Sequence, residues 1–144
     1  MAAKCEYSMG NKTDLFKHKL LENLVKEIDF SNYYEFHSGT GSDNGYKGSS
    51  LRVMDIKPNI NSYLHEINPK LRKKLKKNTS KYQNVSIIDD WNKDVYNHIK
   101  KESYLFMIDP TYLKDYNQKL INYVKKIVDS NSSLFMYIPQ PTGD

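Results

Sequence analysis

The segment YLFMIDPTY, residues 104–112, joins five apolar residues to a turn that carries an acid and an aromatic ring. Its apolar part, Tyr104–Ile108, is typical of a buried β-strand, and four other runs of this kind occur in the chain. Helical segments separate these runs, so strands and helices alternate along the sequence. This alternation predicts an α/β fold with a doubly wound, mostly parallel sheet, forming one domain over residues 1–144.

Apolar periodicity, capping residues and proline positions set the expected elements. Thr13 is placed to cap the first helix, and Asn68 precedes a helix with Pro69 at its first position. Strands are expected at Tyr33–His37, Tyr63–Ile67, Val85–Ile88, Tyr104–Ile108 and Leu134–Ile138. Helices are expected at Asp14–Ile28, Ser49–Met54, Pro69–Lys77, Trp91–Lys101 and Tyr116–Asp129.

Two loops stand out in this order of elements. In a doubly wound sheet with strand order 3-2-1-4-5, ligands bind beyond the carboxyl ends of the strands, where the loops after the first and fourth strands are neighbours. Here those loops are EFHSGTG, residues 35–41, and DPTY, residues 109–112. The segment 42–48 after the first loop is expected to remain irregular.

The first loop has the features of a cofactor site. Gly39 and Gly41 allow the backbone to turn tightly and to approach a ligand closely. Glu35 and His37 precede the glycines, and no helix starts directly after them. This arrangement favours a cofactor with a cationic amino-acid moiety over a pyrophosphate.

Two further acids end the second and third predicted strands. Glu66 is placed to accept both ribose hydroxyls of an adenosine cofactor, and Asp89 to accept from its adenine amino group. Taken singly, each acid is equally consistent with a helix cap or a solvated strand end. Acids at three successive strand ends, together with the glycine loop, favour the cofactor site.

The DPTY turn suggests chemistry on an exocyclic base amine, although Asp-Pro is also common in simple turns. Such an amine is a poor nucleophile because its lone pair is delocalised into the ring. The Asp109 carboxylate and the Pro110 carbonyl could accept its two hydrogens and so favour a nucleophilic nitrogen. Tyr112 would stack on the base held out of its helix or strand.

Composition limits the remaining possibilities. The net charge is +5, and the basic residues are nearly all lysine, which attracts phosphate without reading bases. A base composition rich in A and T in the gene would explain part of this charge equally well. One cysteine and four histidines without metal-ligand spacing argue against zinc, and no metal is expected. No apolar run suggests a membrane span or secretory signal, so a cytoplasmic protein without a membrane partner is expected.

The chain resembles class I S-adenosylmethionine-dependent methyltransferases, and in particular the bacterial adenine-N6 methyltransferases of large-subunit (23S) ribosomal RNA. The matching segments are GNKTDLFKH (10–18), EFHSGTG (35–41), GSSL (48–51), Glu66 in HEINP, and DPTY. The resemblance implies a Rossmann-like sheet, S-adenosylmethionine as cofactor, RNA more than DNA as substrate, and a role in RNA methylation and rRNA processing. It implies cofactor contacts from Lys17, His18, His37, Ser49, Glu66 and Asp89, and makes Asp109 the catalytic carboxylate.

Three departures from the family leave alternatives open. Thr111 replaces the second proline of the family's Asp-Pro-Pro-Tyr, a helical insertion before GSSL is missing, and the sheet is expected to be truncated after its fifth strand. A homo-oligomer or a partner chain could complete the sheet. The alternative function is a non-catalytic module that binds S-adenosylmethionine or a nucleotide together with nucleic acid or a protein. The short partners of three-cysteine-motif proteins share the Lys-His and Gly-Ser features and remain a further alternative.

The segment Pro69–Lys77 is notable for its six basic residues around Leu71 and Leu75. Charge runs of this kind are usually solvated helix faces, and a nucleic-acid contact is the alternative.

Overall fold

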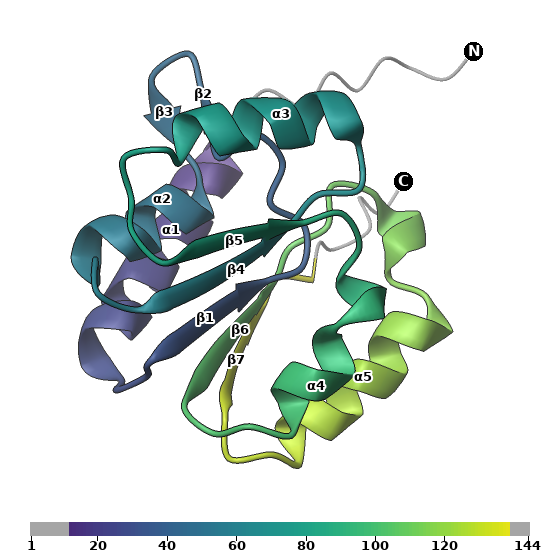
Figure 1. Cartoon of the computed structure of the whole chain (residues 1–144). Coiled ribbons are helices and arrows are strands. Elements are labelled where there is room, and N and C mark those ends of the chain that lie inside the picture. Colours follow the sequence, from purple (N-terminus) through teal and green to yellow (C-terminus); the bar gives the residue numbers. More distant parts are fainter. Residues whose placement is uncertain (1–11, 139–144) are drawn as a thin grey trace.

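A five-stranded parallel sheet with β1 at its centre organises the chain (Figure 1). The computed structural model describes residues 12–138. The strand order is β5-β4-β1-β6-β7, which is the order 3-2-1-4-5 predicted from the sequence. The strands are β1 (Asn32–Glu35), β4 (Asn61–His65), β5 (Val85–Ile88), β6 (Tyr104–Ile108) and β7 (Ser133–Met136).

Helices cover both faces of this sheet, so the doubly wound architecture is confirmed. The first three helices pack against one face and the last two against the other (Figure 1). The helices are α1 (Lys12–Glu27), α2 (Ser49–Ile56), α3 (Pro69–Asn78), α4 (Val95–Ile99) and α5 (Gln118–Val128).

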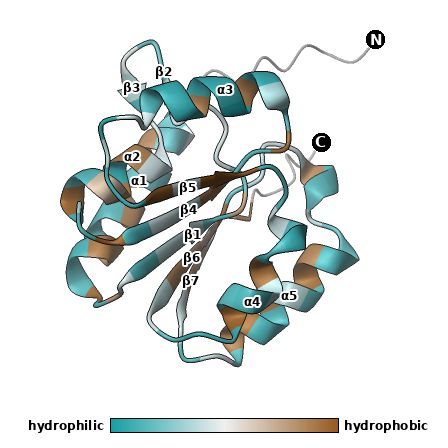
Figure 2. Ribbon diagram, in the orientation of Figure 1, coloured by the Kyte–Doolittle hydropathy of each residue, from teal (hydrophilic) through white to brown (hydrophobic). Residues whose placement is uncertain are grey.

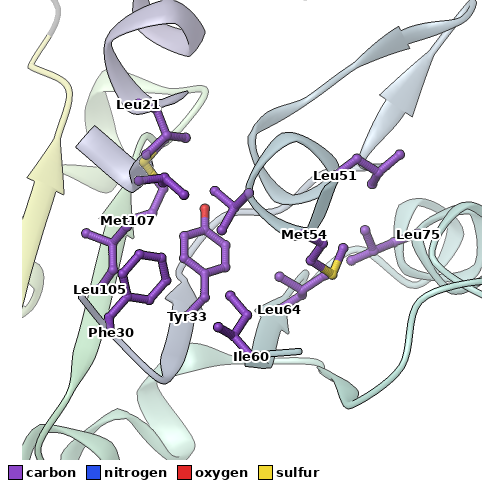
Figure 3. Close-up of a cluster of buried hydrophobic side chains, with 12 residues drawn as sticks. Leu21, Phe30, Tyr33, Leu51, Met54, Ile60, Leu64, Leu75, Leu105 and Met107 are labelled. Carbon is purple, nitrogen blue, oxygen red and sulfur yellow. The ribbon is translucent and has the colours of Figure 1, made fainter. Parts of the chain in front are cut away.

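Side chains of the central strands alternate between two cores. Tyr33 packs with Leu64 and Leu105 in the core beneath α1, α2 and α3, which Figure 3 shows in detail. Its neighbour Tyr34 packs with Phe106 beneath α4 and α5. Because both faces of the sheet are buried, β6 is a continuous apolar run, and this is why the sequence identified it.

A polar network lies in the core beneath α4. Asp94 accepts a hydrogen bond from the Tyr34 hydroxyl at 2.6 Å, and the His65 ring contacts it at 3.0 Å. Nε2 of His98 lies 3.4 Å from the same carboxylate. Burial alone would raise the pKa of Asp94, but the hydrogen bonds from His65, His98 and Tyr34 outweigh it and hold the pKa well below its usual range. The network ties β1 and β4 to the start of α4.

Residues 42–48, predicted as irregular, instead form a small hairpin. Its strands are β2 (Ser42–Asp43) and β3 (Tyr46–Lys47), which pair antiparallel. At the turn, Asn44 and Gly45 have φ angles of 49° and 81°, as in the type I′ turns that join short hairpins.

Two predicted helices also differ from the structure. The segment predicted as one helix at Trp91–Lys101 is divided into a 3-10 turn, η1 (Trp91–Lys93), and α4, with Asp94 between them. The prediction of Thr13 as a cap is wrong, because α1 already includes it. The cap at Asn68 is confirmed, since its side chain accepts from the backbone of the first helical turn.

Several strands and one helix are shorter than predicted at one end. β1, β4 and β7 end before the expected His37, Ile67 and Ile138, and α5 begins after Asn117, which caps it. At the site edge the apolar pattern continues past the last paired residue, through Phe36 after β1 and Ile67 after β4, so the pattern does not fix where the strands end.

Hydrophobic residues mark most of β5 and form stripes on the helices, whereas α3 is mostly hydrophilic (Figure 2). Among residues 12–138, the structure has no helix with the length and apolar character needed to cross a bilayer.

Candidate functional site

The loops after β1 and β6 meet at the carboxyl edge of the sheet, as the sequence predicted. Beyond the end of β1, the Phe36 amide donates to the Met107 carbonyl at 3.1 Å and the Ser38 amide to the His65 carbonyl at 2.9 Å. The chain after β1 is therefore held between β6 and β4 as it enters the glycine loop, residues 37–41. Asp109 follows β6 directly.

Glu35 is a buried carboxylate held by hydroxyl groups. The Tyr33 hydroxyl donates to it at 3.0 Å and the Ser38 hydroxyl at 2.7 Å, and Ser49 at the start of α2 donates to it as well. Burial raises the pKa of Glu35, and the hydroxyl donors oppose this rise. Glu35 and Ser49, both predicted to contact the cofactor, bind each other here and fix the loop to α2.

Lys17 connects α1 with the predicted catalytic turn. Its ammonium lies 2.7 Å from Oδ2 of Asp109 and 3.0 Å from Asp14, and all three side chains are largely buried. Burial lowers the pKa of Lys17, but the two carboxylates outweigh this effect and raise it. Burial also raises the pKa of Asp109, and the attraction of Lys17 only partly offsets that rise. The ion pair therefore places a fixed cation beside Asp109, the carboxylate predicted to be catalytic.

His18 is buried beside the hairpin. Its Nδ1 lies 2.8 Å from the Tyr46 hydroxyl of β3. Burial, together with the nearby charge of Arg52, lowers the pKa of His18 to about 4. His18 is therefore neutral at pH 7, and it contacts Tyr46 through a hydrogen bond without a charge.

Glu66 joins the glycine loop to the start of α3. Gly39, with a φ angle of 60°, donates its amide to Oε1 of Glu66 at 2.9 Å. The other oxygen accepts from the amide of Asn68, also at 2.9 Å. The carboxylate thus lies against the loop, at the position where a ribose was predicted, and its backbone bonds fix its orientation.

Gly41 has a packing role that the sequence did not indicate. Its φ angle is 77°, and a Cβ added to it would lie 2.9 Å from the Leu51 side chain and 3.0 Å from that of Leu75. The second glycine of the loop therefore lets α2 and α3 pack closely against it.

A cavity opens next to the glycine loop and contains three of the predicted cofactor residues. His37 is the notable member, because its Nδ1 is buried and has no hydrogen-bond partner in the described part of the chain. Burial lowers the pKa of His37 to about 4, so the ring is neutral at pH 7. The lining residues are Phe36, His37, His65, Glu66, Ile67, Asp89, Asp90, Trp91 and Asp115.

This lining fits an adenosine cofactor. It combines an aromatic ring, Trp91, with carboxylates at the ends of β4 and β5 and an unsatisfied buried nitrogen on His37. Asp89, the predicted acceptor for adenine, is paired here with Lys93 at 2.8 Å, and its side chain is 44% exposed. Its carboxylate is accessible to a ligand at the mouth of the cavity.

The other two predicted catalytic residues, Pro110 and Tyr112, differ in burial. Pro110 is buried, whereas Tyr112 is 54% exposed and lies next to the Lys114 ammonium. The ring of Tyr112 is therefore accessible from solvent.

Sequence reasoning missed several residues that shape the site. Asp14 holds the second side of Lys17, Tyr46 holds His18, and Trp91 lines the cavity. A signal existed for two of them: Asp14 belongs to the matching segment GNKTDLFKH, and Trp91 is the single tryptophan and follows Asp89 and Asp90 directly. Within residues 12–138 no group of three or more histidine, cysteine or acidic side chains is arranged to hold a metal ion. Cys5 lies outside the described residues.

Comparison with known proteins identifies the fold. No family model matches the sequence, and no curated protein matches it. Among solved structures, LPL1258 of family DUF519 from Legionella pneumophila superimposes with a TM-score of 0.70 at 17% identity, over 90% of this chain and 68% of that one. An rRNA methylase from Streptococcus thermophilus gives 0.54 at 13% identity, over 85% of this chain and 69% of the methylase.

A third match was solved with a cofactor product. The protein SMU.1697c from Streptococcus mutans, in complex with SAH, gives a TM-score of 0.53 at 13% identity, over 78% of this chain and 64% of that one. The chain spans about half to two thirds of the length of the solved structures that it resembles. The chain has the fold of class I S-adenosylmethionine-dependent methyltransferases, as predicted.

The glycine loop yields a stability prediction with a matched control. Gly41→Ala should lower the free energy of unfolding by more than Gly45→Ala, although both residues have positive φ, at 77° and 81°. The left-handed backbone costs about 1–2 kcal/mol at either position. Only at position 41 does the new methyl group meet other side chains, which adds about 1–3 kcal/mol. Urea unfolding of both variants measures the difference, and equal losses would show that Gly41 has no packing role.

Proposed function

We propose that this protein transfers a methyl group from S-adenosylmethionine to the N6 amine of adenine in nucleic acid, with RNA as the substrate. The observation that carries this proposal is the common position of two features at one edge of the sheet. The Asp109-Pro110 turn follows β6, and the acidic, aromatic cavity beside the glycine loop lies beyond β1, β4 and β5. A reacting base and an adenosine cofactor would meet between them.

The cavity residues would hold the cofactor. Glu66 would accept from the ribose hydroxyls and Asp89 from the adenine amine, while Trp91 would contact the adenine face. The glycine loop, fixed through Gly39 to Glu66, would approach the amino-acid end of the cofactor. Bound there, S-adenosylmethionine supplies an electrophilic methyl group on its sulfonium.

Asp109 and Pro110 would orient the substrate amine. Oδ2 of Asp109 is held by Lys17, and Oδ1 makes no hydrogen bond within the described residues, so Oδ1 is available to accept from the amine. The Pro110 carbonyl would accept its second hydrogen. Drawn towards a tetrahedral geometry, the nitrogen would present its lone pair as a nucleophile, and most of the rate acceleration would come from proximity and alignment. Tyr112 would stack on the extruded base.

The second candidate function is a non-catalytic module of the same fold. The observation that favours it is the ion pair between Lys17 and Asp109, which already satisfies one oxygen of the proposed catalytic carboxylate. Thr111 also lacks the rigid ring of the proline found in the resembled family. Such a module would bind S-adenosylmethionine or a nucleotide in the same cavity, together with nucleic acid or a protein.

The test of catalysis is Asp109→Ala, assayed with labelled S-adenosylmethionine on unmodified large-subunit ribosomal RNA and on single-stranded DNA. We expect the methyl-transfer rate to fall about 100- to 1,000-fold, which is typical for the loss of one positioned catalytic group. Cofactor binding should persist, because all the cavity residues except Asp115 lie on β1, β4, β5 and their loops. Tyr112→Ala is the matched variant on the same turn, and it should weaken RNA binding with little effect on cofactor binding.

A wild-type protein that binds S-adenosylmethionine but methylates neither RNA nor DNA would exclude the enzyme and leave the binding module. Transfer by the wild type that Asp109→Ala leaves intact would show that another group orients the amine.

The ion pair with Lys17 predicts a change in pH dependence. Methyl transfer requires Asp109 as a carboxylate, so the rate should fall as the pH drops through its pKa. Burial raises this pKa, and Lys17 opposes the rise. Lys17→Gln removes the charge but keeps a hydrogen-bond donor, so the pKa should rise further and the acid limb of the rate profile should move to higher pH.

Lys119→Gln, which changes an exposed lysine on α5, is the control and should leave that limb in place. An acid limb that does not move in a folded Lys17→Gln protein would show that the ionisation of Asp109 does not govern the rate.

A further inference from the structure

The net positive charge of the protein comes from one helix. α3 contains Lys70, Arg72, Lys73, Lys74, Lys76 and Lys77 and no acidic residue. The rest of the chain then has 16 basic and 17 acidic side chains, which nearly cancel. The mostly hydrophilic colour of α3 in Figure 2 reflects this concentration.

The basic residues of α3 take no part in the ion pairs of the described structure. Lys17, Lys47, Arg52 and Lys93 each form an ion pair with a carboxylate. Within residues 12–138, no ion pair involves a basic residue of α3, and its five lysines are exposed. We call these five the α3 lysine face: Lys70, Lys73, Lys74, Lys76 and Lys77.

The spacing of the lysine face makes it unfavourable without an anionic partner. Lys70, Lys73, Lys74 and Lys77 follow the i, i+3, i+4, i+7 pattern, so like charges are neighbours along one side of the helix. Such pairs destabilise a helix by a few tenths of a kcal/mol each. A row of phosphates would neutralise them and release condensed counterions.

α3 is also fixed to the candidate site at both ends. At its start, Arg72 donates to the carbonyls of Glu66 and Ile67, and Glu66 binds the glycine loop. At its end, the Asn78 amide donates to the carbonyls of Thr40 and Ser42 at 2.8 and 3.4 Å. Leu75 is completely buried beneath the helix. The helix that carries the lysine face therefore has a fixed position relative to the glycine loop and to Glu66, which lines the cavity.

We propose that the α3 lysine face binds the phosphate backbone of the RNA substrate and so holds the strand across the carboxyl edge of the sheet. The inference deepens the proposed function and rests on it for the identity of the nucleic acid. Because lysine ammonium groups are point charges, this face contributes affinity and position, and base selection takes place at the Asp109 turn.

The experiment measures RNA affinity as a function of salt, without cofactor and without methyl transfer. The probe is a fluorescent RNA hairpin with an adenine in its loop, titrated with the full chain between 50 and about 300 mM KCl. The variants are Lys73→Gln with Lys77→Gln on α3, and Lys119→Gln with Lys125→Gln on α5 across the sheet. All four lysines are exposed and lack an ion pair in the described structure. A third variant, Lys73→Arg with Lys77→Arg, retains the charge.

The slope of log affinity against log salt should fall by about 1.4 to 1.8 for the α3 glutamine variant, since each lost phosphate contact contributes about 0.7 to 0.9. The α5 variant and the arginine variant should keep the wild-type slope. Because these measurements need no turnover, an inactive wild type that shows these slopes would defeat the methyltransferase proposal and leave the lysine face standing.

An unchanged slope in the α3 glutamine variant would overturn the inference, and equal losses in the α3 and α5 variants would do the same, by showing only a net-charge effect. Anionic phospholipid vesicles are the competing probe. Binding to vesicles that depends on α3, with RNA binding unaffected, would assign the face to a membrane surface and also overturn the proposal.

Discussion

The parallel pairing of β1 with β4 on one side and β6 on the other is the constraint on which the rest of the molecule depends. It places the carboxyl ends of three strands at one edge, so the glycine loop, Glu66 and Asp109 converge although they are far apart in sequence. It also buries both faces of the central strands, and the helices of each layer pack on a separate apolar core. The same pairing therefore stabilises the sheet and assembles the candidate site.

Electrostatics at this edge divide the acids into two groups. Glu35 and Asp109 are buried, and burial is the largest cause that raises the pKa of each; the charge of Asp109 adds a smaller rise to the pKa of Glu35. Glu35 is satisfied by hydroxyl groups and holds the loop to α2, whereas Asp109 is paired with a cation and keeps one oxygen available. Glu66 and Asp89 lie on the cavity wall, where a ligand can reach them. Under the proposed function, Glu35 would have a structural role, Asp109 would orient the substrate amine, and Glu66 and Asp89 would bind the cofactor.

The sequence predicted the fold well because the deciding signals are local. The run Tyr104–Ile108 matches β6 residue for residue, and Asn68 caps α3 as its position indicated. The hairpin at 42–47 was missed because its strands are two residues long, too short for a pattern, although Asn44-Gly45 is a hairpin signal. The break before α4 depends on partners distant in sequence. So does the ion pair of Lys17 with Asp109, whose two residues are 92 positions apart. Single-sequence patterns do not record such contacts.

The central claim is that the cavity between the glycine loop and Trp91 is a site for S-adenosylmethionine, and calorimetric titration of the wild-type chain with this cofactor tests it most directly. We expect saturable binding at one site per chain, with the product S-adenosylhomocysteine competing for the same site. Adenosine alone should also compete, because Glu66 and Asp89 line the cavity. It should compete more weakly than S-adenosylhomocysteine, because it lacks the amino-acid moiety that the glycine loop would contact. A folded protein that shows no saturable binding of S-adenosylmethionine at millimolar concentration would contradict the account.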